Sequence, residues 1–116
     1  MREQIRDKSR LEHILDAIEK VLEFTENVSF DDYKDNTLLR YGVVKCVEIV
    51  GEASYKLTTN FREQYPNIEW NKIIAMRHIL VHGYYQTKDE VVWDTVKNYF
   101  PHLKEQIQTL YNNEIE

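Results

Sequence analysis

Hydrophobic residues recur at intervals of three and four along most of the chain, which is the spacing of one face of an α-helix. The first such run covers about residues 3–26 and predicts a long helix with a polar outer face. Ser29 follows it, and acidic residues at 31 and 32 come directly after. A serine cap with acids in the first turn is typical of a helix start, so a short second helix is predicted.

A third helix is predicted to begin after Asp35 or Asn36, either of which can cap it. Its apolar residues run from 38 to 57 and cover most of the helix circumference. We therefore expect this helix to be central and the most buried. Gly42 and Gly51 lie on it and would permit close approach of a neighbouring helix, although each costs up to about 1 kcal/mol in helix propensity.

The segment Tyr65-Pro66-Asn67 interrupts the helical pattern, because a proline disfavours helix at the residue before it. A fourth helix is predicted over about residues 69–81, and Gly83 is a natural residue to end it. Thr87 to Glu90 has the pattern of a capping box and predicts the start of a fifth helix. Pro101 either kinks this helix or begins a new one, which continues towards the C-terminus.

Composition supports a helical domain. The chain has 116 residues, with only three glycines and two prolines, whereas sandwiches and barrels need many turns. A hydrophobic content of 42% is ample for a core. The sequence thus predicts a single all-α domain over residues 1–116, a bundle of four to five main helices.

Targeting signals are not apparent in the sequence. No apolar run approaches the roughly 18 residues that span a membrane, and the N-terminus lacks the apolar stretch of a signal peptide. The lone cysteine, Cys46, cannot form an internal disulfide, which fits a reducing compartment. We expect a cytoplasmic protein with no membrane partner.

The net charge of −5 argues against a nucleic-acid ligand when it is taken as an average. The segment from Trp70 to Lys88, however, contains no aspartate or glutamate and is the longest such window in the chain. A negative total does not forbid a local positive site. The lysine, arginine and histidine residues of this window are Lys72, Arg77, His78, His82 and Lys88.

Metal binding is one interpretation of this window. His78 and His82 are four residues apart, which places two imidazoles on one helix face at a usable ligand spacing. Ile79 stands where a zinc-protease motif has glutamate, and no cysteine or acid nearby supplies an obvious third ligand. We therefore predict neither a metal site nor a cofactor. A purely structural interpretation also exists, since a histidine interacts well with the negative end of a helix dipole.

Metal-free RNA cleavage is the third interpretation. It needs a base, an acid and a cation that stabilises the charged phosphorane. His82 can transfer protons near neutrality, and Arg77 can hold phosphate while remaining charged. Tyr84 and Tyr85 add hydroxyls and rings on which a base could stack. Residues five apart point about 140° away from each other on a helix. Arg77 and His82 meet only if the helix end distorts, if the arginine reaches around, or if a second subunit completes the site.

The segment Arg77-x4-His82-Gly83-Tyr84 resembles the R-x4-H-x-Y motif of HEPN domains, and of the HepT toxins in particular. Three further segments fall in the order and spacing of HepT-like chains: Glu48–Ala53, Tyr65–Trp70, and Val91–Trp93 before Pro101. The resemblance covers essentially the whole chain.

The resemblance implies a specific biology. HEPN proteins of this kind are helical-bundle ribonucleases that cleave without metal, as homodimers in which both motif copies line a shared cleft. HepT toxins act on RNA, with tRNA as the expected target class. Their antitoxin is MntA, a minimal nucleotidyltransferase that attaches AMP to the tyrosine of the motif. Carried over, Arg77 and His82 are the catalytic pair, and Tyr84 is the AMP acceptor. Tyr85 lies one position outside the motif and is a second candidate acceptor.

Two further residues are candidates for a supporting role. His78 lies inside the motif on the same face as His82, and family members can hold other residues there, so no catalytic role is transferred to it. Glu52 either forms an exposed salt bridge with Lys56 or orients Arg77 or His82 across the bundle. An alternative function is a non-catalytic HEPN dimer that binds a nucleotidyltransferase or a nucleotide. The intact Arg77 and His82 pair favours catalysis, because a scaffold would not need it.

Overall fold

The computed structural model describes residues 2–83 and 88–115, and every regular element within these ranges is helical. This confirms the predicted all-α bundle. None of the described helices is long and apolar enough to cross a lipid bilayer. The elements in chain order are α1 (Arg2–Phe24), α2 (Phe30–Asp35), α3 (Thr37–Lys56), α4 (Thr59–Gln64), α5 (Trp70–Gly83), α6 (Asp89–Asp94), the π-helical turn η2 (Thr95–Tyr99) and α7 (Phe100–Ile115).

The predicted helix caps are largely confirmed. The side chains of Ser29 and Asn36 each accept a hydrogen bond from the backbone N–H three residues further on, at 3.1 and 3.0 Å. Asn36, and not Asp35, therefore caps α3. The start of α6 differs from the prediction, because Lys88 occupies its N-cap position and makes no capping hydrogen bond with its side chain. The capping box thus placed this helix one residue too early, and Thr87 lies outside the described residues.

The sequence pattern missed the short helix α4. Its N-cap residue, Thr58, is held by Asp7 of α1, which accepts from the Thr58 backbone N–H at 2.9 Å and from its hydroxyl at 2.8 Å. The Asp7 residue is only 6% exposed, and Thr58 is half-buried. A buried carboxylate needs hydrogen-bond donors. Here both donors belong to Thr58, so these bonds join the first turns of α1 to the N-cap of α4.

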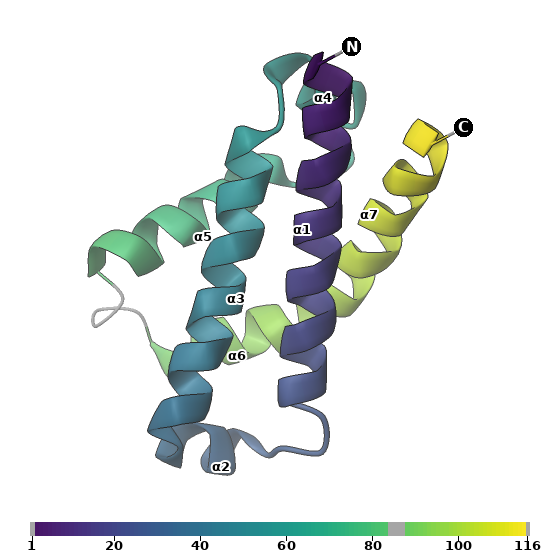
Figure 1. The fold of residues 1–116 in the computed structure, drawn as a ribbon. Coiled ribbons are helices and arrows are strands. Elements are labelled where there is room, and N and C mark those ends of the chain that lie inside the picture. The colour runs from purple at the N-terminus through teal and green to yellow at the C-terminus, as the bar shows by residue number, and fades with distance from the viewer. Residues whose placement is uncertain (1, 84–87, 116) are drawn as a thin grey trace.

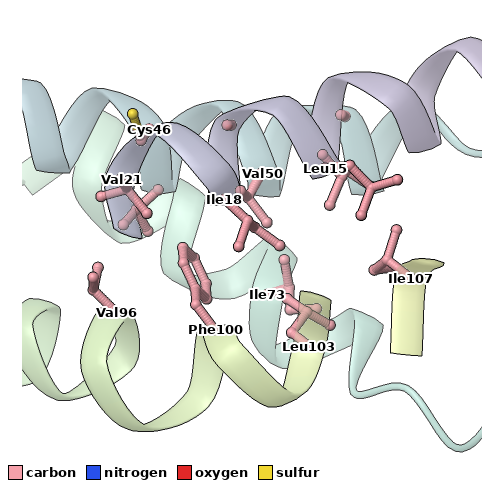
Figure 2. Close-up of a cluster of buried hydrophobic side chains, with 14 of the residues drawn as sticks. Leu15, Ile18, Val21, Cys46, Val50, Ile73, Val96, Phe100, Leu103 and Ile107 are labelled. Carbon is pink, nitrogen blue, oxygen red and sulfur yellow. The ribbon is translucent and has the colours of Figure 1, made fainter. Parts of the chain in front are cut away.

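The long helices pack around one hydrophobic core. In Figure 1, α1 and α3 lie side by side, α7 runs along the other side of α1, and α5 packs against α3. Figure 2 shows side chains of these helices pointing towards one another, with Ile18 and Val50 facing Ile73 and Phe100. Cys46 is buried in this cluster as a free thiol, as its apolar neighbours in the sequence predict.

The chain passes from α6 to α7 through a wide turn. The Phe100 backbone N–H donates to the Thr95 carbonyl five residues earlier, which is the hydrogen bond of a π-helix. Pro101 follows directly, in a helix that continues from η2 into α7, and because proline has no N–H it cannot donate to a carbonyl of the preceding turn. Trp93 packs on the buried ring of Tyr33 with ring centroids 4.8 Å apart, and burial raises the pKa of the Tyr33 phenol to about 12.

Candidate functional site

Helix α5 carries the predicted catalytic pair and is regular through Gly83. Arg77 is partly buried and faces α3, whereas His78 and His82 are exposed. Tyr84 and Tyr85, the candidate acceptors of AMP, lie outside the described residues. The described part of the site therefore consists of an anchored arginine and two histidines at the end of one helix.

Arg77 is anchored by an ion pair across the two helices. Its Nη2 atom lies 2.7 Å from Oε2 of Glu52, whose other oxygen, Oε1, lies 3.3 Å from Lys56 Nζ. Glu52 thus makes both of the contacts that its sequence position left as alternatives. The Glu52 Oε2 atom is shielded from solvent, and its contact with Arg77 lacks the alignment of a hydrogen bond. The positive charge of Arg77 therefore offsets the cost of removing this carboxylate oxygen from water.

A glycine allows this contact to form. A Cβ atom added to Gly51 would overlap Cβ of Arg77 and would lie 3.0 Å from both Arg77 Cγ and the Ile73 carbonyl oxygen. Any larger residue would push α3 and α5 apart. The predicted close approach is therefore confirmed at Gly51 but not at Gly42, where the nearest atoms belong to the Phe24 ring at 4.0 Å.

Arg77 also lines a groove of about 310 Å³ between α1, α3 and α5. Four cationic side chains and two carboxylates line it, so the groove carries a local excess of positive charge although the chain is acidic. Such a groove suits the phosphates of a nucleic acid. Its charged or titratable lining residues are Arg10, His13, Lys45, Glu48, Glu52, Lys56 and Arg77.

Sequence reasoning missed the contribution of α1 to this groove. Arg10 and His13 lie more than 60 residues before Arg77, and their spacing indicates only an ordinary polar helix face. Only the packing of α1 beside α3 brings them to the same groove. Conversely, the segment Trp70–Lys88 contains no acidic residue, but the fold places the carboxylate of Glu52 from α3 against its Arg77.

The two histidines take no part in the ion pair that anchors Arg77. Their ring centroids are 4.6 Å apart, with the ring planes inclined by 54°. Neither imidazole makes a hydrogen bond or an ion pair with any other residue that the structure describes. His82 is not among the lining residues of the groove, and no described contact joins it to Arg77. Within the described residues, one chain does not bring the predicted catalytic pair together.

Most of the chain is similar to a ribonuclease family model and to proteins named as ribonucleases. Residues 14–110 match the family model described as Ribonuclease HepT-like. A protein of Thermococcus cleftensis named "Probable ribonuclease HepT" is 36% identical over 103 residues, which are 89% of this chain and 94% of the relative. "Putative RNase MJ1380" of Methanocaldococcus jannaschii is 34% identical over 101 residues, covering 87% of this chain and 93% of that protein. No solved structure matches significantly.

The helical bundle and these likenesses define a HEPN-type fold of the ribonuclease class. The chain belongs to the HepT-like ribonuclease family. The family resemblance inferred from the motif and its flanking segments is thus confirmed.

The contact between Gly51 and Arg77 makes a paired prediction. Gly51→Ala should lower the free energy of unfolding by about 1–3 kcal/mol, because the added methyl group overlaps Arg77. Gly42→Ala, the matched control on the same helix, should raise it by about 0.5–1 kcal/mol through helix propensity alone. Urea denaturation followed by circular dichroism measures both. Equal effects of the two substitutions would contradict the close contact at Gly51.

Proposed function

We propose that this protein is a metal-independent endoribonuclease in which Arg77 binds the reacting phosphate and His82 transfers protons. The observation that supports this most directly is Arg77 itself. It is held by Glu52, it lines a positively charged groove, and it shares α5 with an exposed histidine. Membership of the HepT-like ribonuclease family supports the same chemistry.

The reaction needs no ion when these residues act together. The 2′-oxygen of a ribose attacks the adjacent phosphorus and loses its proton to a base, while the bond from phosphorus to the 5′-oxygen breaks and that oxygen gains a proton. The product is a cyclic phosphate and a free 5′-hydroxyl. An imidazole can perform either proton transfer, and a guanidinium stabilises the negative charge of the phosphorane. Glu52 is then a positioning residue, because it holds Arg77 and does not need to touch RNA.

A homodimer with a composite site is part of the proposal. The helix end shows no distortion up to Gly83, and Arg77 reaches towards Glu52 and not towards His82. These contacts support the third way to join Arg77 and His82, in which a second subunit contributes one of the two residues. Exposed apolar side chains near the groove, Ile49 and Val81, offer surface that a second copy would bury.

The family resemblance supplies the biological setting of the proposal. We propose that the chain is a toxin that cuts tRNA or another RNA, and that an MntA-like nucleotidyltransferase neutralises it by attaching AMP to Tyr84. AMP would add negative charge and bulk close to the end of α5. Both changes would oppose the entry of an RNA phosphate.

The catalytic assignment predicts the effect of single substitutions. Arg77→Ala and His82→Ala should each lower RNA cleavage by about 10²-fold or more, because each removes one required chemical group. His102→Ala, on the exposed outer side of α7, should leave cleavage unchanged. Purified tRNA incubated with each folded variant, with and without EDTA, gives the rates. Full activity in either motif variant would refute the catalytic assignment, and loss of wild-type activity in EDTA would favour a metal-dependent enzyme. No cleavage by the wild type would favour the non-catalytic alternative.

The modification proposal makes a separate prediction. Co-expression with an MntA-like nucleotidyltransferase should add AMP to the wild-type chain, and Tyr84→Phe should abolish this mass increase. Tyr85→Phe is the matched control and should be modified normally. Intact-mass and peptide mass spectrometry distinguish the two. Modification that persists in Tyr84→Phe would show that another residue is the acceptor.

A further inference from the structure

We propose that His78 and His82 form a two-ligand site for a divalent transition-metal ion such as Ni²⁺ or Cu²⁺, and that an ion bound there inhibits RNA cleavage. The inhibitory part rests on the proposed function of His82, whereas the binding part does not. No metal site is predicted at this pair from the sequence because an obvious third protein ligand is missing, but a reversibly bound inhibitor needs only two protein ligands and water. The ion would be an inhibitor and not a cofactor, so the site is compatible with metal-independent catalysis.

The separation of the two rings fits chelation. A metal–nitrogen bond to histidine is about 2.0–2.1 Å long, so a bound ion lies about 3.2 Å from the centroid of each ring. Two imidazoles at a right angle around one ion then have centroids about 4.5 Å apart, and a tetrahedral angle requires about 5.2 Å. The observed separation of 4.6 Å is close to the first of these values, so rotation of the two exposed side chains would bring one nitrogen of each ring onto the same ion.

The imidazole ligands and the separation of their rings together favour one class of ion. Square-planar and octahedral ions place neighbouring ligands at right angles, and Cu²⁺ and Ni²⁺ with imidazole ligands are of this kind. Tetrahedral Zn²⁺ fits the observed separation less well. No group of three or more histidine, cysteine or acidic side chains that could hold a metal occurs among the described residues. Water would therefore complete the coordination, and binding would be reversible.

The surroundings leave both rings free to bind. His78 and His82 are exposed, and neither donates or accepts a hydrogen bond or forms an ion pair with a described residue. An ion would therefore replace no existing contact of the protein. His82 also lies in the last turn of α5, where the negative end of the helix dipole favours a cation. The other two histidines, His13 and His102, lie singly on α1 and α7 and have no such partner.

A metal ion on His82 would block its catalytic role, because the ion and the proton bind the same lone pair of a ring nitrogen. A metal ion occupies a ring nitrogen of His82 that a proton would otherwise occupy. An imidazole in that state cannot accept the 2′-hydroxyl proton at the same nitrogen. The fixed positive charge and the coordinated water would also fill the space beside the helix end.

The test uses Ni²⁺, since this ion does not oxidise the free thiol of Cys46. NiCl₂ is titrated into the untagged full chain by isothermal titration calorimetry. Wild type should bind about tenfold or more tightly than His78→Ala or His82→Ala, because two ligands on one helix make the second bond intramolecular. His102→Ala, the matched single-histidine control, should bind as wild type does. Circular dichroism confirms that each variant is folded.

Cleavage of tRNA is then measured with and without Ni²⁺, and each variant is compared with its own metal-free rate. Ni²⁺ should slow wild type and His102→Ala, whereas the rate of His78→Ala should change little. Equal Ni²⁺ affinity in wild type and His78→Ala would overturn the site, and tight binding without inhibition would overturn the inhibitory role. If the protein binds Ni²⁺ through this pair but never cleaves RNA, the proposed function fails and the metal site stands.

Discussion

The contact of α3 with α5 at Gly51 is the constraint on which the site depends. Because residue 51 has no side chain, the backbone of α3 comes close enough for Arg77 to pack directly against it. The neighbouring Glu52 then reaches the Arg77 guanidinium at 2.7 Å. One steric feature and one charge therefore set both the helix spacing and the position of the cation that we propose to bind phosphate. A change at either position affects the fold and the site together.

The proposed catalytic pair is divided between two environments. Arg77 is held in a groove by a shielded carboxylate oxygen, whereas His82 is exposed and without a polar partner among the described residues. An anchored cation is suited to binding a phosphate in a fixed place, because little reorganisation is needed when charge develops. An unpartnered imidazole is open to protons, to a second subunit and to metal ions. The same exposure therefore underlies the proposed catalysis and its proposed inhibition.

Local features of the chain were predictable from the sequence, and long-range ones were not. The apolar periodicity and the caps at Ser29 and Asn36 depend on neighbouring residues, so they correctly indicated the long helices and the starts of α2 and α3. Helix α4 depends on Asp7, 51 positions before its cap, and no local pattern shows this. The charge of the groove likewise arises only when α1, α3 and α5 pack together. From the sequence, Glu52 could pair with Lys56 or reach across the bundle to Arg77 or His82, and only the fold shows that it contacts both Lys56 and Arg77.

The central claim is that Arg77 of one subunit acts with His82 of another. Mixing the inactive variants Arg77→Ala and His82→Ala tests it most directly, after subunit exchange that native mass spectrometry confirms. A composite site predicts that roughly a quarter of wild-type cleavage returns, since half of the dimers are mixed and each then holds one intact pair. A mixture that contains heterodimers but is as inactive as either variant alone would contradict the account.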